Sequence, residues 1–251
     1  MCLVLFAYRT HPGLPLVVAA NRDEFYRRPA LAVHRWENDS RVLGGRDLEA
    51  GGSWMGVSTG GRFAAVTNFS DPTDNAPLSR GALVADFLQG TMTVDAYMDG
   101  IDGPRYRGFN LLLWDGEQLA YTSNRAEARV LAPGIYGLSN TMLGGEWPKV
   151  IRGRNALEGA LREAPSTSTL IDLLADDSVP PDDQLPDRGR PLDMERRVAP
   201  MFIRGDEYGT RASTAVLISD DHVTIAEQLY GPGGMTGSRQ EHHLPRERPC
   251  N

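Results

Sequence analysis

The chain opens with Met1-Cys2, and this cysteine has the residue type and the position needed for nucleophilic chemistry. Removal of Met1 would leave Cys2 as the first residue, carrying both a thiol and a free α-amine. An α-amine has an ordinary pKa of about 7.7–8.0, so it can act as a general base near neutral pH. Activation of an N-terminal nucleophile by its own amine is an established form of covalent catalysis. The sequence therefore contains a candidate nucleophile at position 2.

Two short apolar segments must position this cysteine. Residues 3–8 and 16–20 have the length and composition of buried strands, and the residues between them carry Pro and Gly. If Tyr8 pairs with Leu16 in an antiparallel hairpin, Cys2 lies opposite Arg22. Facing residues in such a pair lie about 5 Å apart on one face of the sheet. The predicted hairpin thus puts the thiol beside a guanidinium, which favours the thiolate.

The second strand leads into Asn21-Arg22-Asp23-Glu24, which adds an amide and two carboxylates to the neighbourhood of Cys2. A simpler interpretation is also open. Cys2 would then be a small buried residue that begins a strand, and the charges after Ala20 would form a solvated loop. The hairpin alone does not decide between the two interpretations.

Composition excludes several classes of function. The net charge of −7 provides no basic surface for a nucleic acid partner. The two cysteines, Cys2 and Cys250, do not make a disulfide scaffold, so a reducing compartment and a cytoplasmic location are expected. No apolar run approaches the ~20 residues of a membrane span, and the signal-peptide pattern is missing. The histidines lack metal-ligand spacing, so neither a metal nor a cofactor is expected.

The first half of the chain reads as strands followed by helices. Apolar segments within 31–69 predict an antiparallel meander on the hairpin. The glycines of 44–61 indicate tight turns and close strand approach, because neither phosphate-binding glycine motif is present. Helices are expected at 80–89, capped by Ser79, and from the residue after Thr93 through Met98, capped by Thr93.

The second half repeats this order and ends in a hairpin. The expected elements are strands at 109–114, 118–122, 129–131 and 135–140, helices at 147–163 and 168–175, and a hairpin over 211–230. Residues 176–200 are rich in Asp, Pro and Arg and predict a surface loop or an ordered flap. Residues 231–251 predict an irregular tail. Grouped strands and grouped helices favour antiparallel sheets covered by helices.

Eight short motifs together carry a resemblance to a known family. They are Met1-Cys2, Asn21-Arg22-Asp23-Glu24-Phe25, Gly51-Gly52-Ser53-Trp54, Thr67-Asn68-Phe69, Gly108-Phe109-Asn110-Leu111, Gly137-Leu138-Ser139-Asn140, Trp147-Pro148-Lys149 and Gly209-Thr210-Arg211. As a set they resemble the NRDE family, also called the transport and Golgi organisation family. That family looks like a branch of the N-terminal nucleophile hydrolases. The resemblance implies an α+β fold: a four-layer αββα sandwich of two antiparallel sheets flanked by helices, as a single domain over 1–230.

The order of these motifs is more distantly similar to that of the choloylglycine and penicillin V amidohydrolases. This similarity implies that Cys2 is the nucleophile, that Asp23 orients its amine and that Arg22 lies beside the thiolate. It also implies roles for two asparagines that hold the substrate carbonyl and its oxyanion, and for an arginine that braces the site: Asn68, Asn140 and Arg211. A preorganised amide donor at an oxyanion contributes roughly 3 kcal/mol.

One departure from the amidohydrolase pattern concerns the first cluster. The amidohydrolases place Arg before Asn there, whereas this chain reads Asn21-Arg22. Glu24 is therefore an alternative to Asp23 as the important carboxylate. The residues expected to bind the ligand are Asn21, Glu24 and Trp54.

Two functions from different classes follow from the resemblance. The first is a cysteine hydrolase that cleaves a small acyl-amide through an acyl-cysteine intermediate, which water then resolves. The second is a non-catalytic intracellular carrier of haem or of acyl-CoA and related lipids, in which Cys2 is a ligand contact or a relic. The expected partner is accordingly a small acyl compound or haem, and the hydrolase needs no cofactor.

Overall fold

The computed structural model describes residues 2–69 and 76–246. Its first two strands, β1 (Cys2–His11) and β2 (Leu14–Phe25), form the predicted hairpin. They pair antiparallel with Tyr8 opposite Leu16 and Cys2 opposite Arg22, so the predicted register is confirmed.

Alternate residues of this hairpin face two different layers. Val4 and Phe6 belong to the core between the two sheets, whereas Leu3 and Leu5 pack against helices. Side chains of successive strand residues point to opposite faces, so a strand covered on both sides needs apolar residues throughout. This explains the uninterrupted apolar run at the start of the chain.

The strands form two antiparallel sheets. The six-stranded sheet has the order β10-β1-β2-β11-β12-β13, and the seven-stranded sheet runs from β3 to β9 in chain order. Their remaining strands are β3 (Ala30–Arg35), β4 (Val42–Asp47), β5 (Met55–Ser58), β6 (Phe63–Asn68), β7 (Phe109–Trp114), β8 (Leu119–Ser123), β9 (Arg129–Val130), β10 (Gly134–Leu138), β11 (Tyr208–Ile218), β12 (His222–Gly231) and β13 (Met235–Pro245).

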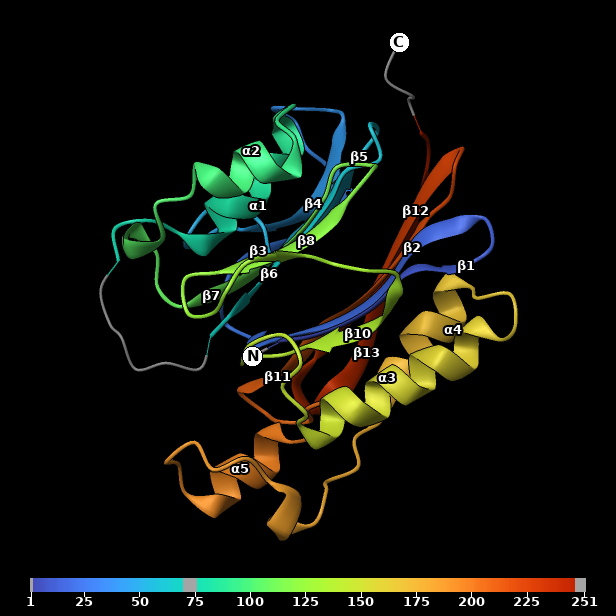
Figure 1. Ribbon diagram of the computed structural model, residues 1–251. Coiled ribbons are helices and arrows are strands. Elements are labelled where there is room, and N and C mark those ends of the chain that lie inside the picture. The colour runs from blue at the N-terminus through green and yellow to red at the C-terminus, as the bar shows by residue number, and fades with distance from the viewer. Residues whose placement is uncertain (1, 70–75, 247–251) are drawn as a thin grey trace.

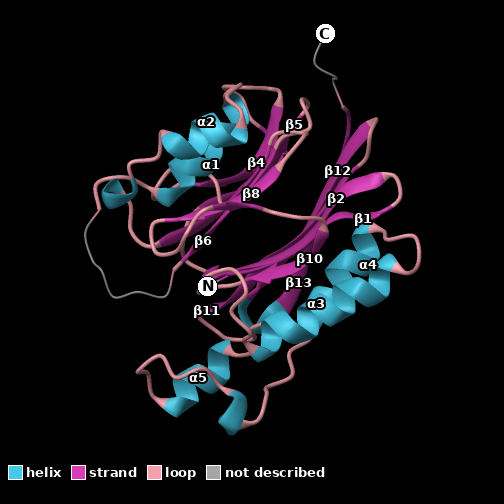
Figure 2. Ribbon diagram, in the orientation of Figure 1, coloured by secondary structure: helices cyan, strands magenta, loops and turns pink. Residues whose placement is uncertain are grey.

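Helices cover the outer face of each sheet, as Figures 1 and 2 show. The helices α1 (Arg80–Gln89) and α2 (Val94–Asp99) pack on the seven-stranded sheet, with Ser79 and Thr93 as their caps. The helices α3 (Pro148–Leu161) and α4 (Thr167–Asp172) pack on the six-stranded sheet. The predicted αββα order of layers is therefore confirmed. Among the described helices, none is long and apolar enough to cross a bilayer.

The antiparallel meander predicted on the hairpin forms part of the second sheet and does not extend the hairpin sheet. The strands β3 to β6 pair with one another and with β7 in the second sheet. Both edges of the hairpin are already occupied, because β10 pairs with β1 and β11 pairs with β2. The meander therefore stacks face to face on the hairpin, and its apolar residues complete the shared core.

Residues 176–200 form an ordered flap rather than an open loop. They contain a short 3₁₀ helix, Asp182–Gln184, and the helix α5 (Leu192–Val198). In Figure 1, α5 lies at the end of the sandwich where β1 begins. A buried ion pair holds the flap: Arg188 Nε donates to Glu195 Oε2 over 2.8 Å, with 9% and 4% of the two side chains exposed.

The irregular tail predicted over 231–251 is wrong for its central part. Residues Met235–Pro245 form β13, which pairs with β12 at the edge of the six-stranded sheet. Only Leu244 in this strand is buried. An exposed edge strand gains its order from backbone hydrogen bonds and needs no apolar alternation, so the period-2 pattern was missing from the sequence. The last residues of the predicted tail, 247–251, lie outside the described residues.

Candidate active site

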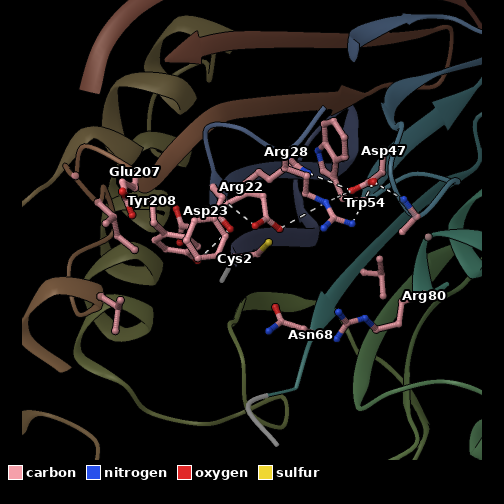
Figure 3. A pocket seen from close by; sticks show the side chains of 18 of the residues that line it. Cys2, Arg22, Asp23, Arg28, Asp47, Trp54, Asn68, Arg80, Glu207 and Tyr208 are labelled. Carbon is pink, nitrogen blue, oxygen red and sulfur yellow. Dashed lines mark hydrogen bonds and ion pairs between the residues drawn. The ribbon is translucent and has the colours of Figure 1, made fainter. Parts of the chain in front are cut away.

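A cavity of about 1020 Å³ opens at the end of the sandwich where β1 starts. Its wall combines the ends of strands from both sheets, the start of α1 and the flap with α5. The predicted site residues in this wall are Cys2, Arg22, Asp23, Glu24, Trp54 and Asn68. Figure 3 shows the Cys2 sulfur inside the cavity, between Asp23 and Asn68.

Cys2 is held by the loop that follows β10. Its backbone N–H donates to Oδ1 of Asn140 over 3.3 Å, and its carbonyl accepts from Oγ of Ser139 over 2.9 Å. The pairing of β1 with β10 brings these residues together although they are far apart in the sequence. The position of the candidate nucleophile is therefore determined by the neighbouring strand.

The two predicted asparagines contact each other beside Cys2. Asn140 Nδ2 donates to the carbonyl oxygen of Asn68 over 2.9 Å and to its Oδ1 over 2.8 Å. Asn140 is 0% exposed and lies behind the cavity, whereas Asn68 lines it. Asn140 thus orients both the Cys2 nitrogen and the amide of Asn68, and Asn68 is the residue that can reach a ligand.

A second layer of hydrogen bonds holds the Asn140 loop on the seven-stranded sheet. Thr67 Oγ1 donates to the Ser139 carbonyl over 2.8 Å, and Asn110 Nδ2 donates to the Thr141 carbonyl over 3.0 Å. The loop therefore connects the two sheets at the site. The motifs containing Thr67 and Asn110 were part of the family resemblance, and their contacts give a physical reason for these residue types.

The groups around Cys2 shift the pKa of its thiol in opposite directions. Burial raises the pKa of the Cys2 thiol, and the negative charge of Asp23 raises it further. The positive charge of Arg22 and a backbone hydrogen bond from Asp23 lower this pKa. Burial dominates, so the thiol keeps its proton at neutral pH and needs a base to become a nucleophile.

Asp23 is a buried carboxylate next to Cys2. Its Oδ1 accepts from Thr210 Oγ1 over 2.7 Å, and its carbonyl oxygen accepts from the Tyr208 hydroxyl over 3.1 Å. Burial raises the pKa of Asp23, and the positive charge of Lys149 is the strongest influence that lowers it.

Lys149 belongs to one of the family motifs, but the sequence analysis assigned it no role in the site. It is the only lysine among 26 basic residues, yet it is 2% exposed, at the start of α3. Its Nζ donates to the Val198 carbonyl over 3.2 Å, at the end of the flap helix α5. Burial lowers the pKa of Lys149, and the charge of Asp23 opposes this shift. A lone lysine in an arginine-rich chain was the available signal.

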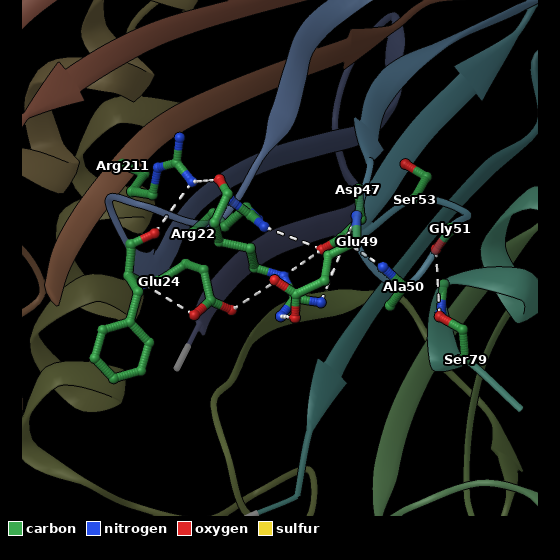
Figure 4. A network of polar contacts seen from close by, with 12 residues as sticks. Arg22, Glu24, Asp47, Glu49, Ala50, Gly51, Ser53, Ser79 and Arg211 are labelled. Atoms are coloured by element: carbon green, nitrogen blue, oxygen red, sulfur yellow. Dashed lines mark hydrogen bonds and ion pairs between the residues drawn. The ribbon is translucent and has the colours of Figure 1, made fainter. Parts of the chain in front are cut away.

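Arg22 crosses from the hairpin to the second sheet. Its guanidinium carbon lies 4.1 Å from the ring centroid of Trp54, and its Nη2 donates to Asp47 Oδ2 over 3.4 Å (Figure 4). Arg28 Nε donates to the same Asp47 oxygen over 2.7 Å. Burial acts to raise the pKa of Asp47, but hydrogen bonds from Arg28 and from two backbone amides hold it below its usual value. Asp47 is thus an ionised anchor that the sequence did not identify.

The glycines before Trp54 explain how that side chain reaches the cavity. Gly52 has φ +76, and a Cβ at this position would lie 2.2 Å from the carbonyl carbon of Gly81 in α1. Ser53 N–H donates to the Gly81 carbonyl over 3.1 Å. Only glycine combines this left-handed conformation with so close an approach. The sequence predicted a close approach between strands, whereas Gly52 approaches a helix and brings the start of α1 into the cavity wall.

Arg211 lies outside the cavity wall. It occupies a bulge in β11, since Thr210 faces Asp23 and Ala212 faces Arg22. Its Nη1 donates to the carbonyl oxygens of Phe25 and Arg28 (Figure 4). Arg211 therefore braces the turn that carries Arg28, and its contact with the site is indirect.

Asn21 also differs from its predicted place. Its Nδ2 donates to the carbonyl oxygens of Leu174 and Met201 over 3.0 and 2.7 Å, and its Oδ1 accepts from Ser213 Oγ over 2.6 Å. The strand alternation turns this side chain toward the helix layer, where the protein itself uses its amide. The prediction that Asn21 binds the ligand is not supported by this geometry. Glu24 does line the cavity, with Oε2 at 3.9 Å from Arg28 Nε.

Within the described part of the chain, no group of three or more His, Cys, Asp or Glu side chains is arranged to hold a metal ion. The polar groups around Cys2 are instead amides, a carboxylate and cations. Groups of these kinds can position a nucleophile, transfer a proton and stabilise a developing oxyanion.

The two stacked antiparallel sheets and the helices outside them define a four-layer αββα protein. The chain is similar to two solved structures, which show the same fold. A conjugated bile acid hydrolase from Clostridium perfringens superposes with a TM-score of 0.55 at 10% identity, covering 98% of this chain and 92% of that one. An N-acylethanolamine-hydrolyzing acid amidase orthologue from Caenorhabditis elegans gives 0.53 at 11% identity, covering 86% and 92%.

Within this class, the chain belongs to the Transport and Golgi organisation 2 family, whose model matches residues 1–232. Two relatives carry the corresponding name. The Bos taurus homologue is 38% identical, and the Homo sapiens homologue is 34% identical, each over 255 residues. Both matches cover 91% of this chain and 92% of the relative. The resemblance inferred from the short motifs is confirmed.

Proposed function

We propose that this protein, after removal of Met1, is a cysteine hydrolase that cleaves a small acyl-amide through an acyl-cysteine intermediate. The observation that carries the proposal is the hydrogen bond from the Cys2 nitrogen to Asn140 Oδ1, at 3.3 Å, on the wall of the 1020 Å³ cavity. Once Met1 is removed, that nitrogen becomes an α-amine. Asn140 would then hold the amine in place beside the thiol.

The proposed reaction begins with a proton transfer from the Cys2 thiol to its own α-amine. Because burial raises the pKa of this thiol, an internal base is required at neutral pH. The resulting thiolate attacks the carbonyl carbon of the substrate, and the carbonyl oxygen becomes an oxyanion. The ammonium group then gives its proton to the leaving nitrogen as the C–N bond breaks.

Asn68 is the proposed oxyanion donor. Its Oδ1 accepts from Asn140, which orients the amide so that Nδ2 is the end available to a ligand in the cavity. In the second half of the reaction, the α-amine takes a proton from water. The hydroxide equivalent attacks the thioester carbon, and the C–S bond breaks to release the acid. The α-ammonium then gives its proton to the Cys2 sulfur, which restores the thiol and the free amine.

Mass spectrometry of the intact protein tests this proposal. We expect the purified chain to lack one methionine residue and to gain one acyl group when mixed with an activated acyl-amide or thioester probe. Cys2→Ala should abolish the adduct, and Cys250→Ser, the matched control at the other cysteine, should retain it. Retention of Met1 in the protein isolated from its own cells would contradict the proposal, as would an adduct that survives in Cys2→Ala.

A carrier of haem or of acyl-CoA is the second candidate, and the size of the cavity favours it. A volume of about 1020 Å³ lies at the upper end of the range for small-molecule sites, roughly 300–1,000 Å³. A titration of the Cys2→Ala variant with haem and with acyl-CoA separates the two candidates. Tight stoichiometric binding, together with no turnover by the wild type, would favour the carrier.

A further inference from the structure

Arg80 is a cavity residue to which neither the family motifs nor the proposed reaction assigns a role. It is the first residue of α1, and its side chain lies on the same side of the cavity as Asn68 in Figure 3. Its Nη1 donates to the Gly108 carbonyl over 3.1 Å. This contact holds the guanidinium at the wall, and its partner is a neutral carbonyl group.

Two other arginines of the cavity wall, Arg22 and Arg28, form ion pairs with carboxylates. Arg22 shares Asp47 with Arg28, and Arg28 also contacts Glu49 Oε1 over 2.7 Å. Across residues 2–69 and 76–246, no carboxylate oxygen lies within 4 Å of the Arg80 guanidinium. Among the described residues, Arg80 therefore differs from Arg22 and Arg28: it lies near the candidate nucleophile, and no carboxylate contacts its guanidinium.

A partly buried guanidinium without a carboxylate in direct contact is costly for the folded protein. Burial lowers the pKa of Arg80, and the nearby charges of Arg107 and Arg28 lower it further, while negative charges on Cys2 and on the more distant Glu24 favour the guanidinium. Arginine presents several N–H donors in a plane and pairs with carboxylates and phosphates through two hydrogen bonds. A bound anion would supply the missing charge and accept these donors.

We propose that Arg80 forms an anion-binding subsite beside Cys2, so that the preferred ligand carries a carboxylate, sulfonate or phosphate close to its carbonyl group. The substrate part of this inference rests on the proposed hydrolase. The subsite itself does not, since a carrier would use it in the same way. An anion held by Arg80 and a carbonyl held by Asn68 would place the reacting carbon near the sulfur.

Alkylation of Cys2 by iodoacetate and by iodoacetamide tests the subsite without knowledge of the substrate. The two reagents differ in charge and are similar in size, and the ratio of their rates is independent of the thiolate fraction at a given pH. We expect the ratio of the iodoacetate rate to the iodoacetamide rate to be about tenfold higher at Cys2 than in free glutathione. One favourable charge contact at a partly screened site has an effect of about this size. Intact mass and peptide mapping report the rates.

Arg80→Gln should lower the ratio about tenfold, and Arg80→Lys should retain most of it because the charge remains. Arg162→Gln removes the same charge from an exposed side chain at the end of α3 and should leave the ratio unchanged. A ratio in Arg80→Gln within twofold of the wild type would overturn the proposal. Thermal unfolding of each variant verifies that it is folded.

A second measurement needs no variant. N-acetylglycine and N-acetylglycinamide differ only in the terminal carboxylate or amide, so protection of wild-type Cys2 from iodoacetamide compares an anion with its neutral analogue. Protection by the carboxylate at lower concentration supports the subsite, and equal protection overturns it. If the wild type shows this preference and hydrolyses no acyl-amide, the hydrolase proposal fails and the anion subsite stands.

Discussion

Asn68 and Asn140 differ in their access to the cavity, so substitution can separate proposed chemistry from packing. We expect Asn68→Ala to lower kcat/KM for amide hydrolysis by about 10²–10³-fold, the usual effect of removing one oxyanion donor. Its melting temperature should change little, because the side chain lies at the cavity wall. Steady-state kinetics and thermal unfolding provide the two measurements.

Asn140→Ala is the informative comparison for this prediction. It removes the partners of the Cys2 nitrogen and of Asn68 from a site that is 0% exposed. A loss of about 1–3 kcal/mol in unfolding free energy is expected in addition to the loss of activity, because buried polar groups lose their hydrogen bonds. If Asn68→Ala lost stability in the same way and retained its turnover, its role as oxyanion donor would be excluded.

Lys149 is predicted to keep the buried Asp23 carboxylate ionised. Burial raises the pKa of Asp23 and the ammonium of Lys149 opposes this rise, so Lys149→Met should raise the Asp23 pKa further. More of Asp23 is then protonated at a given pH. Because ionised Asp23 is expected to orient the α-amine that acts as base, the acidic limb of the pH profile of kcat/KM should move to higher pH by about one unit.

Arg162→Gln is the control for Lys149, because it removes one charge from the exposed end of the same helix. Its pH profile should coincide with that of the wild type. A Lys149→Met variant with lower stability and an unshifted profile would assign Lys149 a structural role alone.

At the scale of elements, the flap with α5 closes one side of the cavity. The guanidinium carbon of Arg188 lies 4.7 Å from the ring centroid of Trp147, and its Nε donates to the buried Glu195. Removal of one partner of a buried pair typically costs about 3–5 kcal/mol. Since Met194 and Val198 on α5 line the cavity, loosening of this helix should expose the site.

Glu195→Gln is therefore expected to increase tryptic cleavage within 186–198 at least tenfold under native conditions. Limited proteolysis followed by mass spectrometry identifies the cut sites. Asp182→Asn breaks the exposed pair with Arg196, in which about half of each side chain is accessible, and should change the cleavage rate by less than twofold. Similar rates for both variants would show that the Arg188–Glu195 pair does not hold the flap.

At the scale of the whole molecule, Glu227 joins the two sheets. It lies on β12, is 1% exposed, and its Oε1 accepts from the Val33 backbone N–H on β3 over 2.7 Å. Burial raises the pKa of Glu227 to about 7. In the unfolded chain this group has its ordinary pKa near 4.3.

This difference determines the sign of a pH effect on stability. Between about pH 4.5 and 7 the folded protein holds a proton on Glu227 that the unfolded chain has released, so this group's contribution to stability decreases as the pH rises. Glu227→Gln should remove a decrease of roughly 3 kcal/mol over this range. Urea unfolding at several pH values measures the slope, and an equal slope in both proteins would contradict the assignment.

The order of layers and much of the site could be predicted from the sequence. The hairpin register follows from the apolar segments and from the position of the turn between them. The pairing of Cys2 with Arg22 could therefore be predicted from the sequence alone. Asn68 and Asn140 were identified through motifs, and their convergence on Cys2 depends on pairings of β1 with β10 and of β6 with β7.

The sequence by itself determined most of the segments that become strands and helices, and it placed the candidate nucleophile at the start of the first strand, because these properties depend on neighbouring residues. Only the tertiary structure decided which distant groups share the cavity. Asp47 and Arg80 reach it from β4 and α1, and Lys149 acts on Asp23 from α3 behind the cavity wall. No spacing along the chain encodes these approaches. The same holds for β13, whose order comes from a backbone partner rather than from its own side chains.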